Sequence, residues 1–364
     1  MHVVFAPDKF AGTLTAVEAA SAMATGWSRR APDDALVQVP MSDGGPGFVD
    51  VLHAALGGDL ETVTVSDPYG GPVPAAILRV GQTAYIESAQ AVGLDLTPVE
   101  ARDPENATSF GLGELLAKAV DTSVARVIVG LGGSAINDGG AGLLAGLGAS
   151  AEGGELDAGP AALAEVRSVD LEAARARVQG VELVLASDVE NPLLGINGAT
   201  KIYGPQKGLP EERLVTVDGW LQRFAELTDR KLATGKGAGA AGGLGFALLL
   251  LGGSRQAGVT VVADAVQLGE KVRGADLVVT GEGAFDFSSR SGKVPYGVAE
   301  VAAQHLVPCI ALAGQVLVGS REMRALGVES AYSVVDLVGE ERAMGAPAES
   351  LAELATRTAR TWSR

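Results

Sequence analysis

The stretch that decides the fold is VARVIVGLGGSAINDGGAGLLAGLGA, residues 124–149. A short apolar, β-branched run leads into a loop that holds six glycines between Gly130 and Gly142, and a second apolar run follows. Glycine is used where the backbone turns sharply or approaches another group closely. The order of these parts predicts a buried strand, a tight loop and a helix, which is the repeating unit of α/β proteins.

The same order recurs elsewhere in the chain. HVVFAPDKFAG (2–12) precedes the helical pattern of residues 15–30, and GADLVVTGEGAFD (274–286) precedes that of residues 295–306. Continuous apolar strands that alternate with helices predict mainly parallel sheets buried on both faces. In AAILRVGQTAYIESA (75–89) apolar residues alternate instead, which predicts a β-hairpin. With 364 residues, we expect two α/β domains.

Composition excludes several function classes. The formal net charge of −16 gives a surface that repels phosphate backbones, so we expect no nucleic-acid partner. The longest apolar stretch, residues 244–253, is too short to span a bilayer, and the N-terminus lacks the features of a signal peptide. The single cysteine, Cys309, lies in an apolar run and is expected in the core. We therefore expect a cytoplasmic protein with no membrane association.

Glycine- and acid-rich segments follow the predicted strands, where ligands of α/β proteins gather. There are six of them: PDKFAGTLTA (7–16), MSDGGPG (41–47), GLGGSAINDGGAG (130–142), SDVENPLLG (187–195), YGPQKG (203–208) and TGEGAFDFSSRSGK (280–293).

The loop 130–142 allows three interpretations. None of the three is a Walker A loop. The lysine of such a loop would be Lys293, in the segment 280–293, and Phe287 stands where the first glycine of the pattern would be. Gly130, Gly132 and Ala135 fit the dinucleotide pattern G-x-G-x-x-A, but INDGG interrupts the helix that should follow. The loop is also compatible with a nest of backbone N–H groups for phosphate oxygens. Its glycines could equally serve only tight packing between strand and helix.

Charged side chains in the other segments suggest phosphate chemistry. Asp188 follows a buried-looking strand and suits a general base for a hydroxyl, with Asp43 as the rival. Lys207, held on a tight loop, suits an anion ligand. Glu282 and Asp286, with Lys293 nearby, suit Mg²⁺ and phosphate handling.

Taken together and in this order, the segments resemble the bacterial glycerate kinase family, of the glycerate 2-kinase type found in sugar-acid pathways. The resemblance covers nearly the whole chain and rests on APDKFAGTLTA, SDGGPG, TSFGLGELL, GLGGSAINDGGAGLLAGLG, SDVENPLLGINGATKIYGPQKG, GAGAAGGLGFAL and GEGAFDFSSRSGKVPYGVA.

This resemblance implies two α/β domains with an active site in the cleft between them, one domain being inserted into the other. We place the inserted domain at residues 65–262 and the discontinuous domain at residues 1–64 plus 263–364. The implied activity transfers the γ-phosphoryl group of ATP to D-glycerate with Mg²⁺, giving mostly 2-phosphoglycerate. A homodimer is compatible with this reading.

On this basis we assign expected roles. The expected catalytic residues are Asp188, Asp43 and Lys207, and the expected Mg²⁺ ligands are Glu282 and Asp286. The residues expected to bind substrate or nucleotide are Asp8, Lys9, Gly132, Gly133, Ser134, Asn137, Asp138, Asn191, Gln206 and Lys293.

Two positions depart from the family pattern. Ala11 stands where relatives usually carry Lys, and Ala284 stands where they usually carry Arg. Lys9 could replace the first cation and Arg290 the second. Two other functions therefore stay open: a weakly active or non-catalytic metabolite-binding relative, and, from the pattern at Gly130–Ala135, an NAD-dependent oxidoreductase of a small hydroxy acid.

Overall fold

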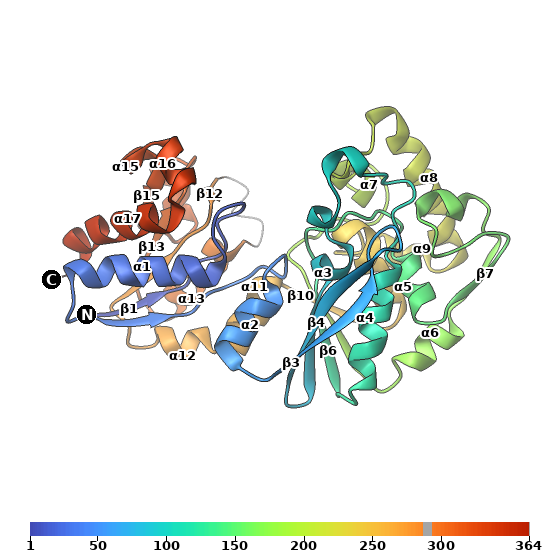
Figure 1. Cartoon of the computed structure of the whole chain (residues 1–364), viewed down its shortest axis with the longest axis horizontal. Helices are drawn as coiled ribbons and strands as arrows, with labels where there is room; N and C mark the ends of the chain where they lie inside the picture. The colour runs from blue at the N-terminus through green and yellow to red at the C-terminus, as the bar shows by residue number, and fades with distance from the viewer. Residues whose placement is uncertain (287–292, 364) are drawn as a thin grey trace. The chain divides into compact units, whose positions relative to one another are not determined.

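A computed structural model describes residues 1–286 and 293–363 of the chain. The chain forms two compact units (Figure 1). Unit 1 contains Met1–Asp43, Asp50–Gly57 and Ala257–Arg364, and unit 2 contains Gly44–Val49 and Gly58–Gln256. Each unit is built on its own mainly parallel sheet covered by helices, so the predicted α/β class is confirmed. The borders expected at residues 65 and 262 stay predictions.

Unit 1 is built on a five-stranded parallel sheet in the order β15-β13-β11-β1-β2. Numbered along the chain, that order is 5-4-3-1-2, so the strand order reverses between β1 and β11. In open α/β sheets this switch point is where ligands bind, outside the carboxyl ends of the strands. The strands are β1 His2–Phe5, β2 Ala35–Gln38, β11 Leu277–Thr280, β13 Cys309–Ala313 and β15 Ser330–Ser333.

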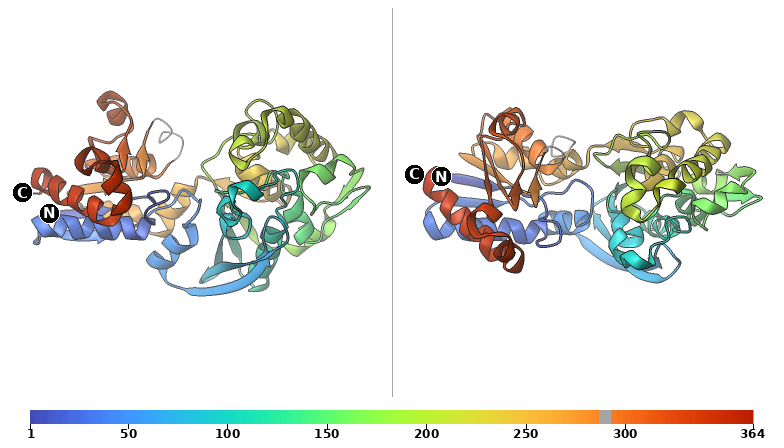
Figure 2. Two further views of the ribbon diagram at one scale, coloured as in Figure 1. Left: turned by 45° about the horizontal axis from the view of Figure 1, so that its top comes forward. Right: turned by 90° about the horizontal axis from the view of Figure 1, so that it is seen from above.

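Helices α1 (Ala16–Arg30) and α17 (Pro347–Trp362) pack side by side on this sheet (Figures 1 and 2). Thr15 caps α1: its hydroxyl accepts a bond from the Glu18 amide, and the Glu18 carboxylate accepts one from the Thr15 amide. Gly26 is required at their contact, because a Cβ there would overlap the carbonyl oxygen of Ala352.

The remaining elements of unit 1 are α2 Phe48–Leu56, which begins in unit 2, α11 Gly258–Ala265, α12 Leu268–Val272, β12 Ala284–Phe285, α13 Val294–Gln304, β14 Gln315–Val316, α14 Ser320–Ala325, α15 Val334–Val338 and α16 Glu340–Gly345.

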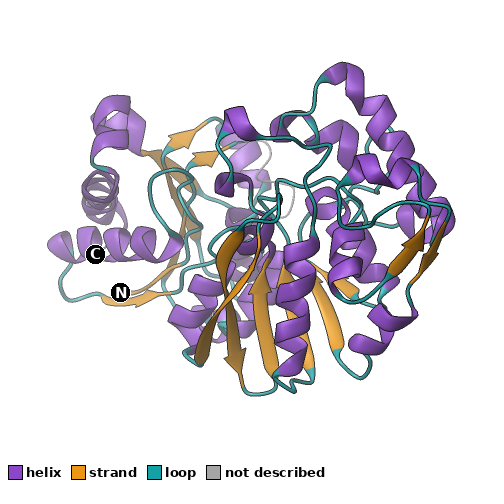
Figure 3. Cartoon of the chain, turned by 45° about the vertical axis from the view of Figure 1, so that its right-hand side comes forward, coloured by secondary structure: helices purple, strands orange, loops and turns teal. Residues whose placement is uncertain are grey.

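Unit 2 is built on a six-stranded sheet in the order β10-β9-β6-β5-β4-β3 (Figure 3). The predicted hairpin is confirmed, because β4 and β5 pair antiparallel, whereas β5, β6, β9 and β10 are parallel. The register aligns Glu87, Gly130, Ala186 and Gln256 in one row at the carboxyl ends of these parallel strands. The strands are β3 Asp59–Ser66, β4 Pro72–Val80, β5 Thr83–Glu87, β6 Arg126–Gly130, β9 Glu182–Ala186 and β10 Ser254–Gln256.

Helices and a small hairpin complete unit 2. One buried hydrophobic cluster, including the edge-to-face rings of Phe224 and Phe246, joins the helices to the sheet. No helix in the described part of the chain combines the length and the apolar character that crossing a membrane requires. The remaining α-helices and strands are α3 Ser88–Val92, α4 Phe110–Asp121, α5 Ala141–Gly146, β7 Ser150–Glu152, β8 Ser168–Asp170, α6 Glu172–Arg177, α7 Ala199–Tyr203, α8 Leu214–Leu227, α9 Arg230–Ala233 and α10 Leu244–Leu250. Short 3-10 helices lie at Leu94–Leu96, Val99–Ala101, Pro160–Ala164, Pro205–Lys207, Glu211–Arg213 and Ala240–Gly243.

Candidate active site

The carboxyl edge of the unit 1 sheet carries a cluster of charged side chains. Lys9 lies between two carboxylates, with its Nζ 3.8 Å from Asp8 and 3.6 Å from Asp43. Asp8 follows β1 and Glu282 follows β11, so they flank the switch point of the sheet. We call Asp8, Lys9, Asp43, Glu282, Asp286 and Lys293 the Asp8 cluster.

Burial perturbs the carboxyl of Asp8. Its side chain is buried, and the loss of water raises the pKa of the carboxyl to about 7. Lys9 opposes this rise, while the neighbouring charges of Asp43 and Glu282 add to it. A buried acid near neutrality at a sheet edge is typical of functional sites.

Glu282 and Asp286 share one cation. Lys293 Nζ lies 3.7 Å from Glu282 and 3.9 Å from Asp286, so the sequence-based grouping of these three residues is present in the structure. Among the described residues no three acidic, histidine or cysteine side chains form a ready-made metal cage. Mg²⁺ is usually held by one or two carboxylates together with substrate phosphates, so this pair of acids fits such an ion.

In unit 2 the loop 130–142 packs closely against the SDGGPG segment. A Cβ on Gly130 would meet the carbonyl oxygen of Gly44, and one on Gly132 would lie 2.7 Å from the Cα of Gly45. Gly133 has a φ of 61° and is exposed. A Cβ on Gly133 would lie 2.7 Å from Cγ of Pro46, so the packing interpretation holds for Gly130, Gly132 and Gly133, and the positive φ of Gly133 favours glycine as well.

Asp138 fixes the shape of this loop from inside. Its carboxylate is fully buried and accepts bonds from the Ser109 amide (2.8 Å), the Ser109 hydroxyl (2.7 Å), the Gly140 amide (2.9 Å) and the Gly142 amide (3.2 Å). Burial raises the pKa of this carboxyl, and these bonds oppose the rise. Both oxygens thus bind the protein itself, which indicates a positioning role.

Lys207 is buried beside the same loop. Its ammonium donates to the Ser134 hydroxyl at 3.0 Å and to the carbonyl oxygen of Ile136. Burial lowers the pKa of Lys207 to about 7, and the charge of Asp138 opposes that fall. The structure thus brings Lys207, Ser134 and Asp138 together, but Lys207 is only 2% exposed. It holds the loop rather than projecting from it.

Asn137 is the third buried polar residue at this loop. Its side-chain amide donates to the Thr200 hydroxyl at 3.0 Å, and the residue is fully buried. Within the described residues its carbonyl oxygen Oδ1 has no hydrogen-bond partner. A buried acceptor without a partner is costly, so this oxygen suits a donor supplied by a ligand.

The perturbed Lys207 predicts a pH dependence of stability. An unfolded lysine titrates near 10.5 and the folded one near 7, so the unfolded state binds more protons between these values. The free energy of unfolding should therefore rise with pH over this window, and fall as pH decreases toward 7. We expect urea midpoints to show this rise in the wild type and to lack it in Lys207→Met. Parallel profiles for the two proteins would contradict the assignment.

Three further predicted residues lie in unit 2, Asp188 and Asn191 in a loop and Gln206 in a short 3-10 helix, Pro205–Lys207. Asp188 is half-buried directly after β9 and Ser187, at the carboxyl edge of the sheet. Asn191 is tied into its own loop, since it donates to the carbonyl oxygen of Asn197 and accepts from the hydroxyl of Tyr203, both at 2.8 Å. Gln206 is exposed.

The two departures from the family pattern meet in unit 1. Ala11 and Ala284 line the same cavity, of about 260 Å³. Lys9, one expected replacement cation, belongs to the Asp8 cluster. Arg290, the other, lies outside the described residues.

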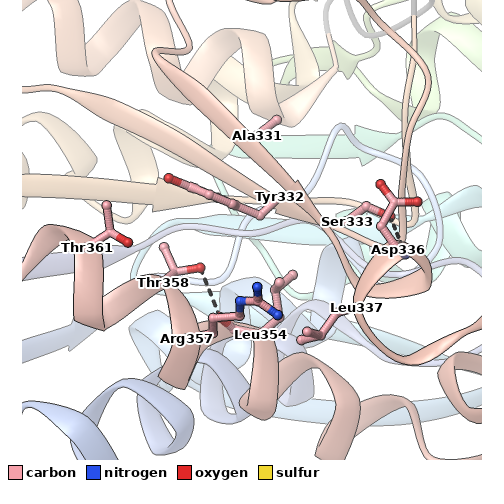
Figure 4. Close-up of a pocket in the computed structure, with 9 residues that line it drawn as sticks. All are labelled: Ala331, Tyr332, Ser333, Asp336, Leu337, Leu354, Arg357, Thr358 and Thr361. Carbon is pink, nitrogen blue, oxygen red and sulfur yellow. Dashed lines mark hydrogen bonds between the residues drawn. The ribbon is translucent and has the colours of Figure 1, made fainter.

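A second, larger cavity of about 360 Å³ lies along strand β15 of unit 1. Figure 4 shows Tyr332 of the strand together with Arg357 and Thr361 of α17 around it. None of the residues that sequence reasoning singled out lines this cavity, so we place the candidate site elsewhere.

Cys309 is confirmed as a core residue. It lies in β13, is 1% exposed, and burial raises the pKa of its thiol to about 12. Because the thiolate is the reactive form, we expect no reaction with a disulfide reagent such as DTNB in the folded protein. One thiol per chain should react after unfolding in guanidinium, as followed by absorbance. Rapid reaction of the native protein would contradict this.

Sequence reasoning missed the partners of the loop residues. Ser109 supports Asp138, Thr200 supports Asn137, and Glu87 accepts bonds from the amides of Gly47 (3.1 Å) and Val49 (3.3 Å). Ser109 lies in TSFG, which carried part of the resemblance without an assigned role. Nothing in the local sequence marked Thr200 or Glu87.

Comparisons with known proteins agree with this arrangement. The sequence profile of the Glycerate kinase family matches residues 3–363. The chain is 40% identical to "Glycerate 2-kinase" of Escherichia coli over 93% of this chain and 92% of that protein. It is 41% identical to "Glycerate kinase" of Haemophilus influenzae, with 93% of each chain covered.

A solved structure extends the agreement to the fold. A crystal structure described as glycerate kinase 2 from Salmonella typhimurium LT2 superposes with a TM-score of 0.82 at 36% identity, covering 99% of this chain and 98% of that one. The match of the family profile across almost the whole chain, together with these relatives, shows that this chain belongs to the glycerate kinase family.

Proposed function

We propose that this protein transfers the γ-phosphoryl group of ATP to D-glycerate and forms 2-phosphoglycerate and ADP. The observation that carries the proposal is the Asp8 cluster, with its cations and carboxylates at the switch point of a parallel sheet in a glycerate kinase family chain. Phosphoryl transfer depends mainly on positioning and on neutralising charge, and the cluster offers both. The name of the Escherichia coli relative supports the 2-position.

In this reaction the attacking hydroxyl oxygen of D-glycerate forms a bond to the γ-phosphorus. The bond from that phosphorus to the β,γ-bridging oxygen breaks, and ADP leaves. We assign Asp188 as the base that accepts the hydroxyl proton, with Asp43 as its rival. Lys9 and Lys293 offset negative charge on the phosphates.

Mg²⁺ bound with ATP would neutralise charge on the phosphate oxygens, and Glu282 and Asp286 are the residues that would hold it. In the loop 130–142 Gly133 is exposed, whereas Asn137, Lys207 and Asp138 are buried and keep the loop in shape. Asn191 stabilises the loop that carries Asp188.

The test is an ADP-release assay with D-glycerate and a panel of small hydroxy acids, with the product position read by phosphorus NMR. We expect ADP release that depends on D-glycerate and a phosphate on the second carbon. Release only with another acid would redefine the substrate. Absence of release with every acid would favour a metabolite-binding protein, and an NADH fluorescence titration separates the oxidoreductase alternative.

A further inference from the structure

The 260 Å³ cavity of unit 1 lies where the fold places ligands. It is lined by residues from the loops after four parallel strands: Phe10 and Ala11 after β1, Gly283 and Ala284 after β11, Gly314 and Gln315 after β13, and Val334 and Val335 at the end of β15. Four loops that converge from one sheet edge form the usual position of a ligand crevice in an open α/β sheet. The cavity is thus a product of the sheet topology.

The lining of this cavity selects against anions. Its walls are mostly apolar and include Phe10, Leu14 and Leu351, and Glu340 is the one charged side chain among the described residues that line it. A carboxylate or a phosphate would lose hydration there and would meet a negative charge. D-glycerate and the triphosphate of ATP are therefore poor occupants, whereas a neutral ring with hydrogen-bond donors is a good one.

The cavity is continuous along the chain with the Asp8 cluster. Phe10 directly follows Lys9, and Gly283 directly follows Glu282. The loops are bonded to each other, since the Gly314 amide donates to the Glu282 carbonyl at 3.1 Å and the Gln315 amide donates to that of Gly283 at 3.0 Å. A ligand with a neutral ring and an anionic tail would match an apolar cavity that adjoins Lys9, Lys293 and the two acids that would hold Mg²⁺.

We propose that this cavity binds the adenine ring of ATP, with the phosphates directed toward Lys9 and Lys293. The inference rests on the proposed function, because the use of ATP supplies the ligand. The volume is slightly below the range of about 300–1,000 Å³ for sites that enclose drug-sized ligands, which suits one ring system rather than a whole nucleotide. The small side chains of Ala11 and Ala284 leave this volume open.

Glu340 sets which nucleobase the cavity prefers. Its carboxylate accepts hydrogen bonds and donates none, so it favours the exocyclic amine of adenine. Inosine triphosphate (ITP) carries a carbonyl oxygen at that position. This oxygen and the carboxylate are both acceptors, so they cannot form a hydrogen bond with each other. We expect ATP to be preferred over ITP by about two- to tenfold, the range for one net hydrogen bond at a solvent-accessible site, and Glu340→Gln to reduce this preference.

The main experiment fills the cavity. Ala11 is exposed, so Ala11→Phe should fold normally while its ring occupies the space. Ala284→Leu is the second filling variant, in case the first disturbs Lys9. Thr361→Phe is the matched control, because Thr361 is also exposed and lines the other cavity of the same unit (Figure 4).

Adenosine and inorganic tripolyphosphate with Mg²⁺ are the binding probes, measured by calorimetry, and KM is measured for both substrates. We expect both filling variants to raise the Kd for adenosine and the KM for ATP by about tenfold, or about 1.4 kcal/mol. Tripolyphosphate binding, the KM for D-glycerate and the control should change less than about twofold, far below that tenfold step.

Two results would overturn the inference: unchanged adenosine binding in both filling variants, or an equal loss of tripolyphosphate binding, which would place the phosphates in the cavity. If the wild type phosphorylates no acid but still binds adenosine, and Ala11→Phe abolishes that binding, the proposed function fails and the adenine site in this cavity is supported. If the wild type is an active kinase and filling the cavity leaves adenosine binding unchanged, the proposed adenine site is wrong while the proposed function stands.

Discussion

Replacing Asp188 by Asn is expected to lower kcat by about two to four orders of magnitude, the usual cost of losing a well-placed general base. The substitution keeps the shape of the side chain but removes its ability to accept the hydroxyl proton. The KM values should change much less, because the residue acts on proton transfer in the transition state and not on substrate binding. Steady-state ADP release at saturating substrates measures the effect.

The same loop offers a matched control. Glu190 is two residues further on, is exposed, and pairs with Lys236 at 2.9 Å and Arg255 at 3.7 Å. Glu190→Gln removes a negative charge from this loop without touching the assigned base, so its kcat should stay within about twofold of the wild type, as for a surface change of about 0.5 kcal/mol or less. Equal losses in both variants would indicate an electrostatic effect of the loop.

Asp43 is the rival base, and the comparison with Asp43→Asn decides between the two. If Asp188 is the base, Asp188→Asn should lose far more kcat than Asp43→Asn. Near-normal turnover in Asp188→Asn with an intact fold, together with a loss of two or more orders of magnitude in Asp43→Asn, about what losing a general base costs, would transfer the role to Asp43.

Much of the fold could be predicted from the sequence because its signals are local. The run VARVIVG became β6, the alternating stretch 75–89 became the β4–β5 hairpin, and Thr15 with Glu18 marks the start of α1. Each of these depends on periodicity or capping within a few residues. The sheet order, with its reversal between β1 and β11, depends on contacts between distant strands and could not be predicted from such local patterns.

The candidate site shows the same division. The sequence located Asp138 and Lys207, but not the fact that both are buried and directed into the protein. Ser109 is 29 residues from Asp138, so their bond exists only once the sheet has formed. The two alanines that depart from the family pattern lie in separate loops, and only the structure places Ala11 and Ala284 in one cavity.

The second large effect concerns stability: Asp138→Ala is expected to destabilise the protein by about 3–5 kcal/mol. The change leaves the buried donors of Ser109, Gly140 and Gly142 without their acceptor, and each unsatisfied buried group costs about 1–3 kcal/mol. Since about 1 kcal/mol shifts Tm by about 2–4 °C in a domain of 150–250 residues, calorimetry should show a fall of about 10 °C.

Asp157→Asn is the control for that measurement, because Asp157 is exposed in the same unit and its substitution should change the free energy of unfolding by less than about 0.5 kcal/mol.

Ser109→Ala removes a hydroxyl that donates to Asp138 and also accepts from the Leu143 amide at 2.8 Å, so this variant should be destabilised as well. The two losses should be less than additive in the double variant, because both act on one network. A variant Asp138→Ala with unchanged Tm and lost nucleotide binding would instead make Asp138 a direct ligand of phosphate or metal. The melting temperature therefore distinguishes a residue that shapes the loop from one that binds the substrate.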